Sequence, residues 1–239
     1  TQIDERLYNI TKDKAKFRLS EASAVLEGFA QEIEQTIFYG NVNSAPREFH
    51  GLSPRFNSLS AANGNQVVNA GGSGSDNTSI WFVTTGPQTC GLLYPQGTSS
   101  GMERKDLGAE TYQDSNGGLI RYVREQFMQH IGFYLADWRY VSRVANIDVS
   151  NLSTGSAADL FDKMIDAYYK LQNRKGTMGF TMADSQPITI KPIIFCNTTI
   201  KSFLHKQART NANTMLSLRE IDGEEVMSFL GMQIVETDG

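Results

Sequence analysis

The residue types that could do chemistry are sparse in this chain, and their spacing fits no familiar catalytic or metal site. The three histidines, His50, His130 and His205, are 80 and 75 residues apart, and no H-x-x-x-H or C-x-x-C pair accompanies them. The glycine-rich run at 71–77 (GGSGSDN) lacks the G-x-x-x-x-G-K-[ST] frame of a phosphate loop, so it indicates a flexible surface loop. The sequence contains no G-x-S-x-G motif either. We therefore expect no catalytic, cofactor-binding or metal-ligating residues, and no cofactor.

The two cysteines, Cys90 and Cys196, each lie in an apolar run, TCGLLY and PIIFCN. A disulfide between them remains open, but isolated cysteines in strand-like segments favour buried, unreactive side chains. Acidic residues are plentiful, yet a sequence alone cannot pair two of them for acid–base work. These observations weaken an enzymatic interpretation without removing it.

Composition excludes several classes of protein. The chain has 239 residues, of which 20% are charged and 40% hydrophobic, as in ordinary globular proteins of one large domain or two lobes. The net charge of −4 gives no basic excess for nucleic-acid binding, and the clusters at 12–16, 104–105 and 174–175 suit solvated surfaces. No run approaches the ~18 apolar residues of a membrane span. The sequence therefore predicts a cytosolic protein without a membrane partner.

Two helices are expected at the N-terminal end. Residues 1–18 carry apolar side chains at helical spacing and predict a short amphipathic helix. A longer helix is predicted over 20–39, with Ser20 as its N-cap and Gly40 as its stop signal. Its apolar residues recur at steps of three and four, which predicts one buried face containing Leu26, Phe29 and Ile33.

The next segment changes character. Residues 41–78 are rich in Gly, Ser and Asn and predict a long irregular segment, whose part 58–78 we expect to be mobile. The apolar runs at 79–85 and 89–95 then predict strands.

Residues 118–146 alternate between apolar and polar side chains. This pattern predicts two long antiparallel strands hinged near 130–132. Trp138 and Tyr140 share one face of the second strand, so we expect both in the core, with Trp138 packed against the helix at 20–39.

The last third of the chain mixes both kinds of element. A capping box at Ser156 and Asp159 predicts a helix over 156–172, and a second helix is predicted over 198–209. Strands are predicted at 192–197, 215–221 and 225–236. Segregated helices and antiparallel strands indicate an α+β fold.

Five segments, in a fixed order along the chain, carry a resemblance to a known family. They are FRLSEASAVLEGFAQEIEQTIFYGN (17–41), GLSPRFN (51–57), SIWFVTTGPQTCGLLYPQG (79–97), DLGAETYQDSNGG (106–118) and DWRYVSRVANID (137–148). Together they resemble the major capsid proteins of short-tailed bacteriophages of the epsilon fifteen type. The resemblance implies the Hong Kong 97 fold of tailed-phage shells.

What the resemblance implies about function is specific. The chain would be a structural subunit that binds copies of itself in pentamers and hexamers, builds an icosahedral shell and encloses double-stranded DNA non-specifically. Scaffold, portal and cement proteins would be further partners. The protein would reside in the virion capsid, and in the host cytoplasm during assembly.

The resemblance also implies an arrangement in lobes. A peripheral lobe would comprise residues 1–150, joined by a return strand at 226–239, and an axial lobe would comprise 151–225. Within the loop 173–191, Lys175, Phe180 and Met182 would contact neighbouring subunits. Family members carry an N-terminal arm and an extended loop ahead of the long helix. We therefore expect this chain to be a fragment that stays a monomer or a loose ring.

Two alternatives remain open at this point. A bacterial nanocompartment shell would share the fold but bind cargo enzymes, and the presence or absence of DNA in native particles would separate the two. A hydrolase would instead require a deep pocket with clustered titratable groups.

Overall fold

The computed structural model divides the chain into two compact units. Unit 1 comprises Thr1–Glu34 and Leu92–Gly132, and unit 2 comprises Gln35–Gly91 and Phe133–Gly239. The structure describes residues 1–97, 101–152, 159–172, 177–181, 187–189, 192–210, 216–221 and 224–237, with backbone alone for 177–181, 187–189, 208–210, 216–221 and 224–226. The division differs from the expected boundary at residue 150, because unit 1 takes two separate stretches of the chain.

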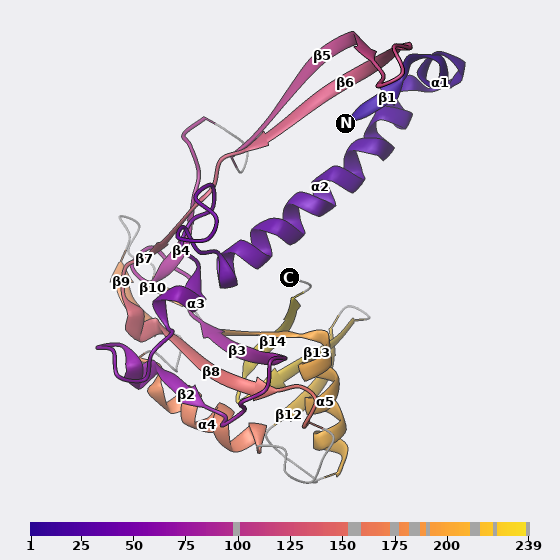
Figure 1. Cartoon of the computed structure of the whole chain (residues 1–239). Helices are drawn as coiled ribbons and strands as arrows, with labels where there is room; N and C mark the ends of the chain where they lie inside the picture. The colour runs from indigo at the N-terminus through magenta and orange to yellow at the C-terminus, as the bar shows by residue number, and fades with distance from the viewer. Residues whose placement is uncertain are drawn as a thin grey trace. The chain divides into compact units, whose positions relative to one another are not determined.

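Unit 1 is built on a three-stranded antiparallel sheet with the strand order β1-β6-β5. Its elements, seen at the top of Figure 1, are β1 (Gln2–Asp4), α1 (Glu5–Ile10), the first part of α2 (Lys14–Tyr39), β5 (Met102–Gln113) and β6 (Leu119–Gln129). The register of the β5–β6 hairpin shifts between Asp106 and Gly108, where Gly108 adopts a φ of 71° that favours glycine. The sequence analysis did not predict β5, because nearly all of its side chains are exposed and show no alternation.

The long helix is confirmed, but it begins earlier than predicted. Asp13 caps it by accepting a hydrogen bond from the Lys16 backbone N–H, so Ser20 lies inside the helix and is not the N-cap. The C-terminal end is as predicted, with the Gly40 N–H donating to the Thr36 carbonyl. The predicted helix at 1–18 is only partly right, because β1 precedes the short α1.

Leu26, Phe29 and Ile33 on α2 are half-buried and belong to neither buried cluster, which corrects their assignment to the core. The physical reason is that few side chains of unit 1 pack against this face of the helix. Within unit 1 this helix face has only three strands opposite it, and an open groove remains beside Phe29.

Unit 2 contains a seven-stranded mixed sheet with the strand order β12-β13-β14-β11-β3-β8-β2. Its strands are β2 (Val67–Asn69), β3 (Asn77–Val83), β8 (Val141–Asp148), β11 (Ile193–Asn197), β12 (Leu216–Ile221), β13 (Glu224–Phe229) and β14 (Met232–Thr237). The pairs β2–β8 and β11–β14 are parallel, and the other pairs are antiparallel. The predicted strand at 225–236 is in fact two strands, which turn at Leu230 and Gly231, both with positive φ. β14 pairs with β11 inside unit 2, and the expected lobe boundaries remain a prediction.

Side chains on both faces of this sheet are buried. On β3, Ile80 and Phe82 belong to one buried cluster, while Trp81 and Val83 belong to the other, as expected from the twofold alternation of a strand. The first cluster also includes side chains of α4 (Leu160–Lys170) and α5 (Thr198–Thr210). Both predicted helices are therefore confirmed within the described residues, whereas Ser156 of the predicted capping box lies outside them.

The segment 41–78 is more ordered than predicted. It contains α3 (Leu52–Arg55), a 3₁₀ turn η1 (Gly64–Gln66) and β2. Four apolar side chains of the segment, Leu52, Phe56, Val67 and Val68, are buried, whereas Val42 and Leu59 are exposed. These four anchors hold a polar segment in place, so the expectation of an irregular 58–78 is wrong for η1 and β2.

Residues 118–146 do form strands, but the two halves do not pair with each other. β6 pairs with β5 and β1, the short β7 (Gly132–Leu135) pairs with β4 (Cys90–Leu93), and β8 pairs with β3 and β2. The remaining two-stranded sheet joins β9 (Thr177–Thr181) and β10 (Pro187–Thr189). Alternation thus identified the strands but not their partners.

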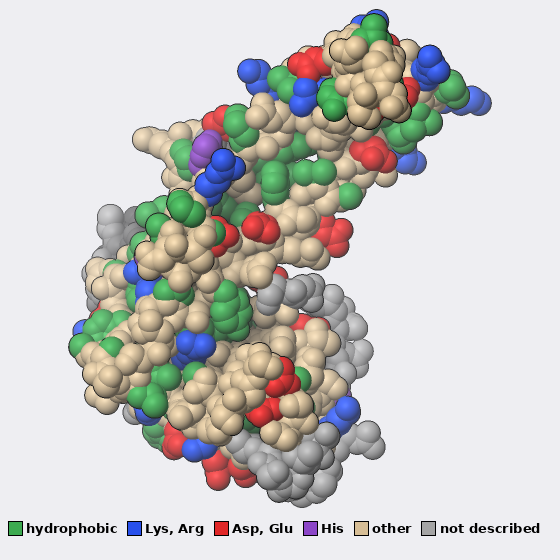
Figure 2. Space-filling model, in the orientation of Figure 1, with side chains coloured by type: hydrophobic (Ala, Val, Ile, Leu, Met, Phe, Trp, Pro, Cys, Tyr) green, Lys and Arg blue, Asp and Glu red, His purple; other side chains and the backbone are tan. Residues whose placement is uncertain are grey.

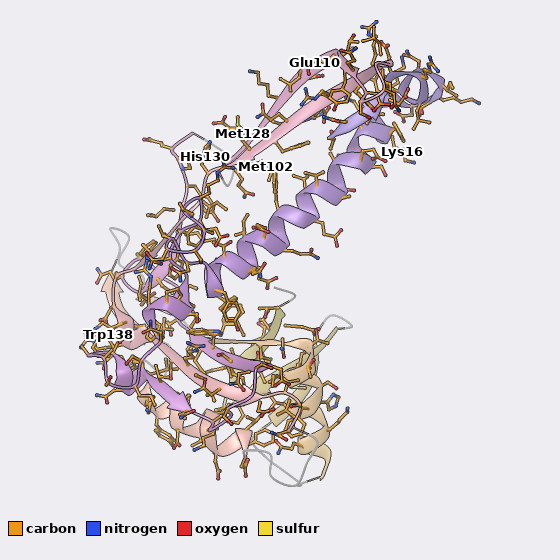
Figure 3. All side chains as sticks on the ribbon, in the orientation of Figure 1. Lys16, Met102, Glu110, Met128, His130 and Trp138 are labelled. Atoms are coloured by element: carbon orange, nitrogen blue, oxygen red, sulfur yellow. The ribbon has the colours of Figure 1, made fainter. Side chains whose placement is uncertain are left out.

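Trp138 is 38% exposed and lies in neither buried cluster, so its assignment to the core and to a contact with the long helix is wrong. The alternation breaks because Trp138–Tyr140 form a 3₁₀ turn, η2, which Asp137 caps by accepting from the Arg139 backbone N–H. Figure 3 shows Trp138 at the outer edge of the chain. Tyr140 is half-buried.

This contrast yields a stability prediction. Phe82→Ala should lower the free energy of unfolding by about 3–5 kcal/mol, because it empties a fully buried aromatic site. Trp138→Ala should cost less than half as much. Denaturant titration followed by circular dichroism measures both, and equal losses would contradict the assignment of the core.

Candidate assembly surface

Within the described residues, no group of three or more His, Cys, Asp or Glu side chains is placed to hold a metal ion. Cys90 and Cys196 are free and buried, which confirms the prediction for both. Burial raises the pKa of each thiol to about 12, so neither is a thiolate at neutral pH. No described helix is long and apolar enough to cross a membrane.

Unit 1 is held together by a cluster of ion pairs around a buried carboxylate. The Glu125 side chain on β6 is only 2% exposed, and its Oε1 lies 2.8 Å from Arg18 Nε of α2 and 2.6 Å from Arg104 Nη2 of β5. Arg18 Nη1 also donates to Asp106 Oδ2 of β5 at 2.9 Å. The cluster therefore joins the long helix to both strands of the hairpin.

The cluster also affects titration. The hydrogen bond from Arg18, and then that from the Gly108 backbone N–H, lower the pKa of Asp106. A lowered carboxyl pKa stabilises the folded state, and this contribution is fully present above the ordinary pKa of aspartate. It is lost as the pH falls from the ordinary pKa through the lowered pKa of the folded state. Asp106 is exposed, so its share is small and Glu125 is the anchor.

An open groove lies beside this cluster. It has a volume of about 470 Å³ and is lined by Val25 and Phe29 of α2, Leu107 of β5 and Phe127 of β6, next to Glu125. Within the described residues, Arg18 Nη2 and Glu125 Oε2 are buried without a hydrogen-bond partner. Unit 1 thus keeps apolar surface and polar atoms that its own chain does not satisfy.

Unit 1 also exposes large apolar side chains. Six of them are more than half exposed: Leu7, Ile10, Leu19, Leu93, Tyr112 and Leu119. Figure 2 shows hydrophobic side chains at the surface around α1 and the end of the hairpin. A three-stranded sheet and one helix cannot cover both faces of each other, so this surface suits contacts with other protein chains.

Comparison with known proteins identifies the family of the chain. The family model for major capsid protein GP7 matches residues 1–239. The chain belongs to the major capsid protein GP7 family. A search among curated proteins gives no match.

A solved structure agrees with the family assignment. A chain of the near-atomic cryo-electron-microscopy structure of bacteriophage epsilon15 is 35% identical and superposes with a TM-score of 0.65, over 100% of this chain and 69% of that chain. The resemblance and the α+β fold class are therefore confirmed. The chain is a structural subunit of a phage head, and its place is the virion.

The predicted contact residues of the loop 173–191 are not tested by the structure. Lys175 and Met182 lie outside the described residues, and Phe180 is described only as backbone in β9. They remain predictions. The sequence analysis missed the ion-pair cluster, although one signal was present: Glu125 is in phase with the buried Val123 on an alternating strand. A carboxylate at an inward position requires a cationic partner.

The buried carboxylate gives a second prediction. Glu125→Ala leaves Arg18 and Arg104 without their shared partner and should destabilise unit 1 by about 3–5 kcal/mol. Glu110→Ala is the matched control, because Glu110 on the same hairpin pairs with Arg124 at the surface and should contribute about 0–1 kcal/mol (Figure 3). Amide hydrogen exchange along β6 measures the difference. Equal protection in both variants would show that the cluster does not anchor the hairpin.

Proposed function

We propose that the full-length protein assembles into pentamers and hexamers, that these build an icosahedral head, and that the head encloses double-stranded DNA non-specifically. Assembly takes place in the host cytoplasm, with scaffold, portal and cement proteins as further partners. The protein works through its interfaces and carries out no catalytic step. The observation that carries the proposal is the family match over residues 1–239.

The surface of unit 1 supports this proposal. Ring-forming contacts between identical subunits are head-to-tail, so each subunit needs at least two different contact surfaces. Unit 1, with its groove and exposed apolar side chains, would provide one such surface as part of the peripheral lobe. The segment 173–191 would supply the other, around the axis of each ring.

The net charge of −4 also suits a container for DNA. Walls rich in lysine would hold the phosphate backbone by releasing counterions and would hinder packaging and ejection. The negative net charge is therefore a supporting observation, and the family match is the main one.

Electron microscopy of the full-length protein, expressed alone and then with its phage partners, tests the proposal. We expect rings of five or six subunits and closed shells, and nuclease-protected double-stranded DNA in native particles. Particles that carry a protein cargo and no DNA would favour a nanocompartment shell, and the absence of rings and shells would refute the proposal.

A third prediction concerns the ring contact. Phe180→Asp should reduce the yield of rings several-fold, because it places a charge in an interface expected to be largely apolar. The monomer should keep its circular dichroism spectrum. Unchanged ring formation would remove the loop 173–191 from the interface.

A further inference from the structure

One face of α2 carries an ordered set of exposed side chains. Lys16, Ser20, Ser23, Glu27 and Ala30 are spaced by four, three, four and three residues, which places them in one line along the helix. All five are exposed. We call this line the α2 stripe. Figure 3 shows Lys16 on the side of α2 that points away from the hairpin.

The two charged members of the α2 stripe have no partner within the described part of the chain. The side chains of Lys16 and Glu27 take part in none of the ion pairs or side-chain hydrogen bonds there. Lys16 also lies near the N-terminal end of the helix, where the helix dipole disfavours a positive charge. Interactions within the helix therefore do not explain why Lys16 and Glu27 lie on the α2 stripe.

The charges of the α2 stripe are complementary to those of a second copy. We propose that the α2 helices of two subunits pack antiparallel through the α2 stripe, so that Lys16 of each meets Glu27 of the other. This inference rests on the proposed function, in which copies of this chain bind one another. It names one contact between two copies that the family assignment does not supply, and it predicts a dimer of this chain where the sequence analysis expects a monomer or a loose ring.

The geometry favours this arrangement over others. Lys16 and Glu27 are eleven residues apart, about 16 Å along the axis, so a twofold axis midway between them forms both ion pairs at once. Ser20 and Ser23 then meet at the centre, where small side chains let two helices approach closely. A parallel pair would place Lys16 against Lys16.

An exposed apolar residue borders the α2 stripe. Leu19 of α2 is 68% exposed, although its side chain is large and aliphatic. Antiparallel packing would remove part of this side chain from water, which adds a hydrophobic contribution to the ion pairs. The contact is therefore not electrostatic alone.

Charge reversal tests the pairing directly. Lys16→Glu and Glu27→Lys should each weaken self-association of the 239-residue chain at least about tenfold, because each variant places like charges opposite one another twice. An equimolar mixture of the two variants should recover association, since positions 16 and 27 then carry opposite charges wherever one variant meets the other. Sedimentation velocity at low ionic strength measures all three samples, and added salt should weaken the wild-type pair.

Matched controls keep the test specific. Lys12→Glu and Glu21→Lys make the same charge changes at exposed positions outside the α2 stripe and should leave association unchanged. A wild-type chain that stays monomeric, single variants that associate like wild type, or a mixture that shows no recovery would each overturn the inference.

Shell formation by the full-length protein separates the two proposals. If the single variants form shells with wild-type yield, the α2 pairing is wrong and the proposed function stands. If the wild-type protein forms neither rings nor shells, the proposed function fails, and sedimentation still decides whether α2 pairs.

Discussion

Strand β3 is the element on which the packing of unit 2 depends. It places Ile80 and Phe82 in one buried cluster and Trp81 and Val83 in the other, so that both faces of the mixed sheet are covered. The neighbouring strand β8 supports it through Arg143, whose guanidinium lies 4.8 Å from the centre of the Trp81 ring and donates to the Ser79 hydroxyl and the Phe56 carbonyl. Burial lowers the pKa of Arg143, and these contacts compensate for the lost hydration of its charge.

Unit 1, in contrast to unit 2, has little buried apolar surface. Its sheet has three strands, and the helix face beside the sheet is only half-buried, so apolar packing is incomplete. The buried ion pairs of Glu125 therefore help to hold α2, β5 and β6 together. A buried charge is sensitive to the loss of any one of its ion-pair partners, which makes the relative placement of α2, β5 and β6 specific. Because unit 1 has so few packed elements, apolar side chains and a groove remain at its surface. In a monomeric enzyme such a surface would be a liability, whereas in a capsid subunit it is available for contacts with other chains.

The family assignment and the structure agree on how such a protein works. A head protein needs no substrate pocket, and its action lies in the angles and affinities at which copies meet. Weak contacts of several kinds suit assembly, because each can form and dissociate until the shell is closed. The groove of unit 1, the α2 stripe and the loop 173–191 are the three surfaces that we propose for such contacts. Only the first two lie on described side chains, and charge complementarity makes the α2 stripe the most specific of them.

The sequence alone determined the local elements and the family. Helical spacing located the body of α2, the Gly40 stop ended it, and the apolar runs located β3 and β11, because these signals arise within a few residues. The order of five sequence segments identified the capsid family without any structural information. Tertiary structure decided the rest. Alternation at 118–146 could not reveal that β6 pairs with β5, since strand partners are chosen by distant residues. Leu52, Phe56 and Val67 order a polar segment because partners elsewhere in the chain bury them, and Trp138 is exposed because a 3₁₀ turn removes it from the strand. Glu125 is stable inside unit 1 only because Arg18 and Arg104, far from it in sequence, come within ion-pair distance when the chain folds.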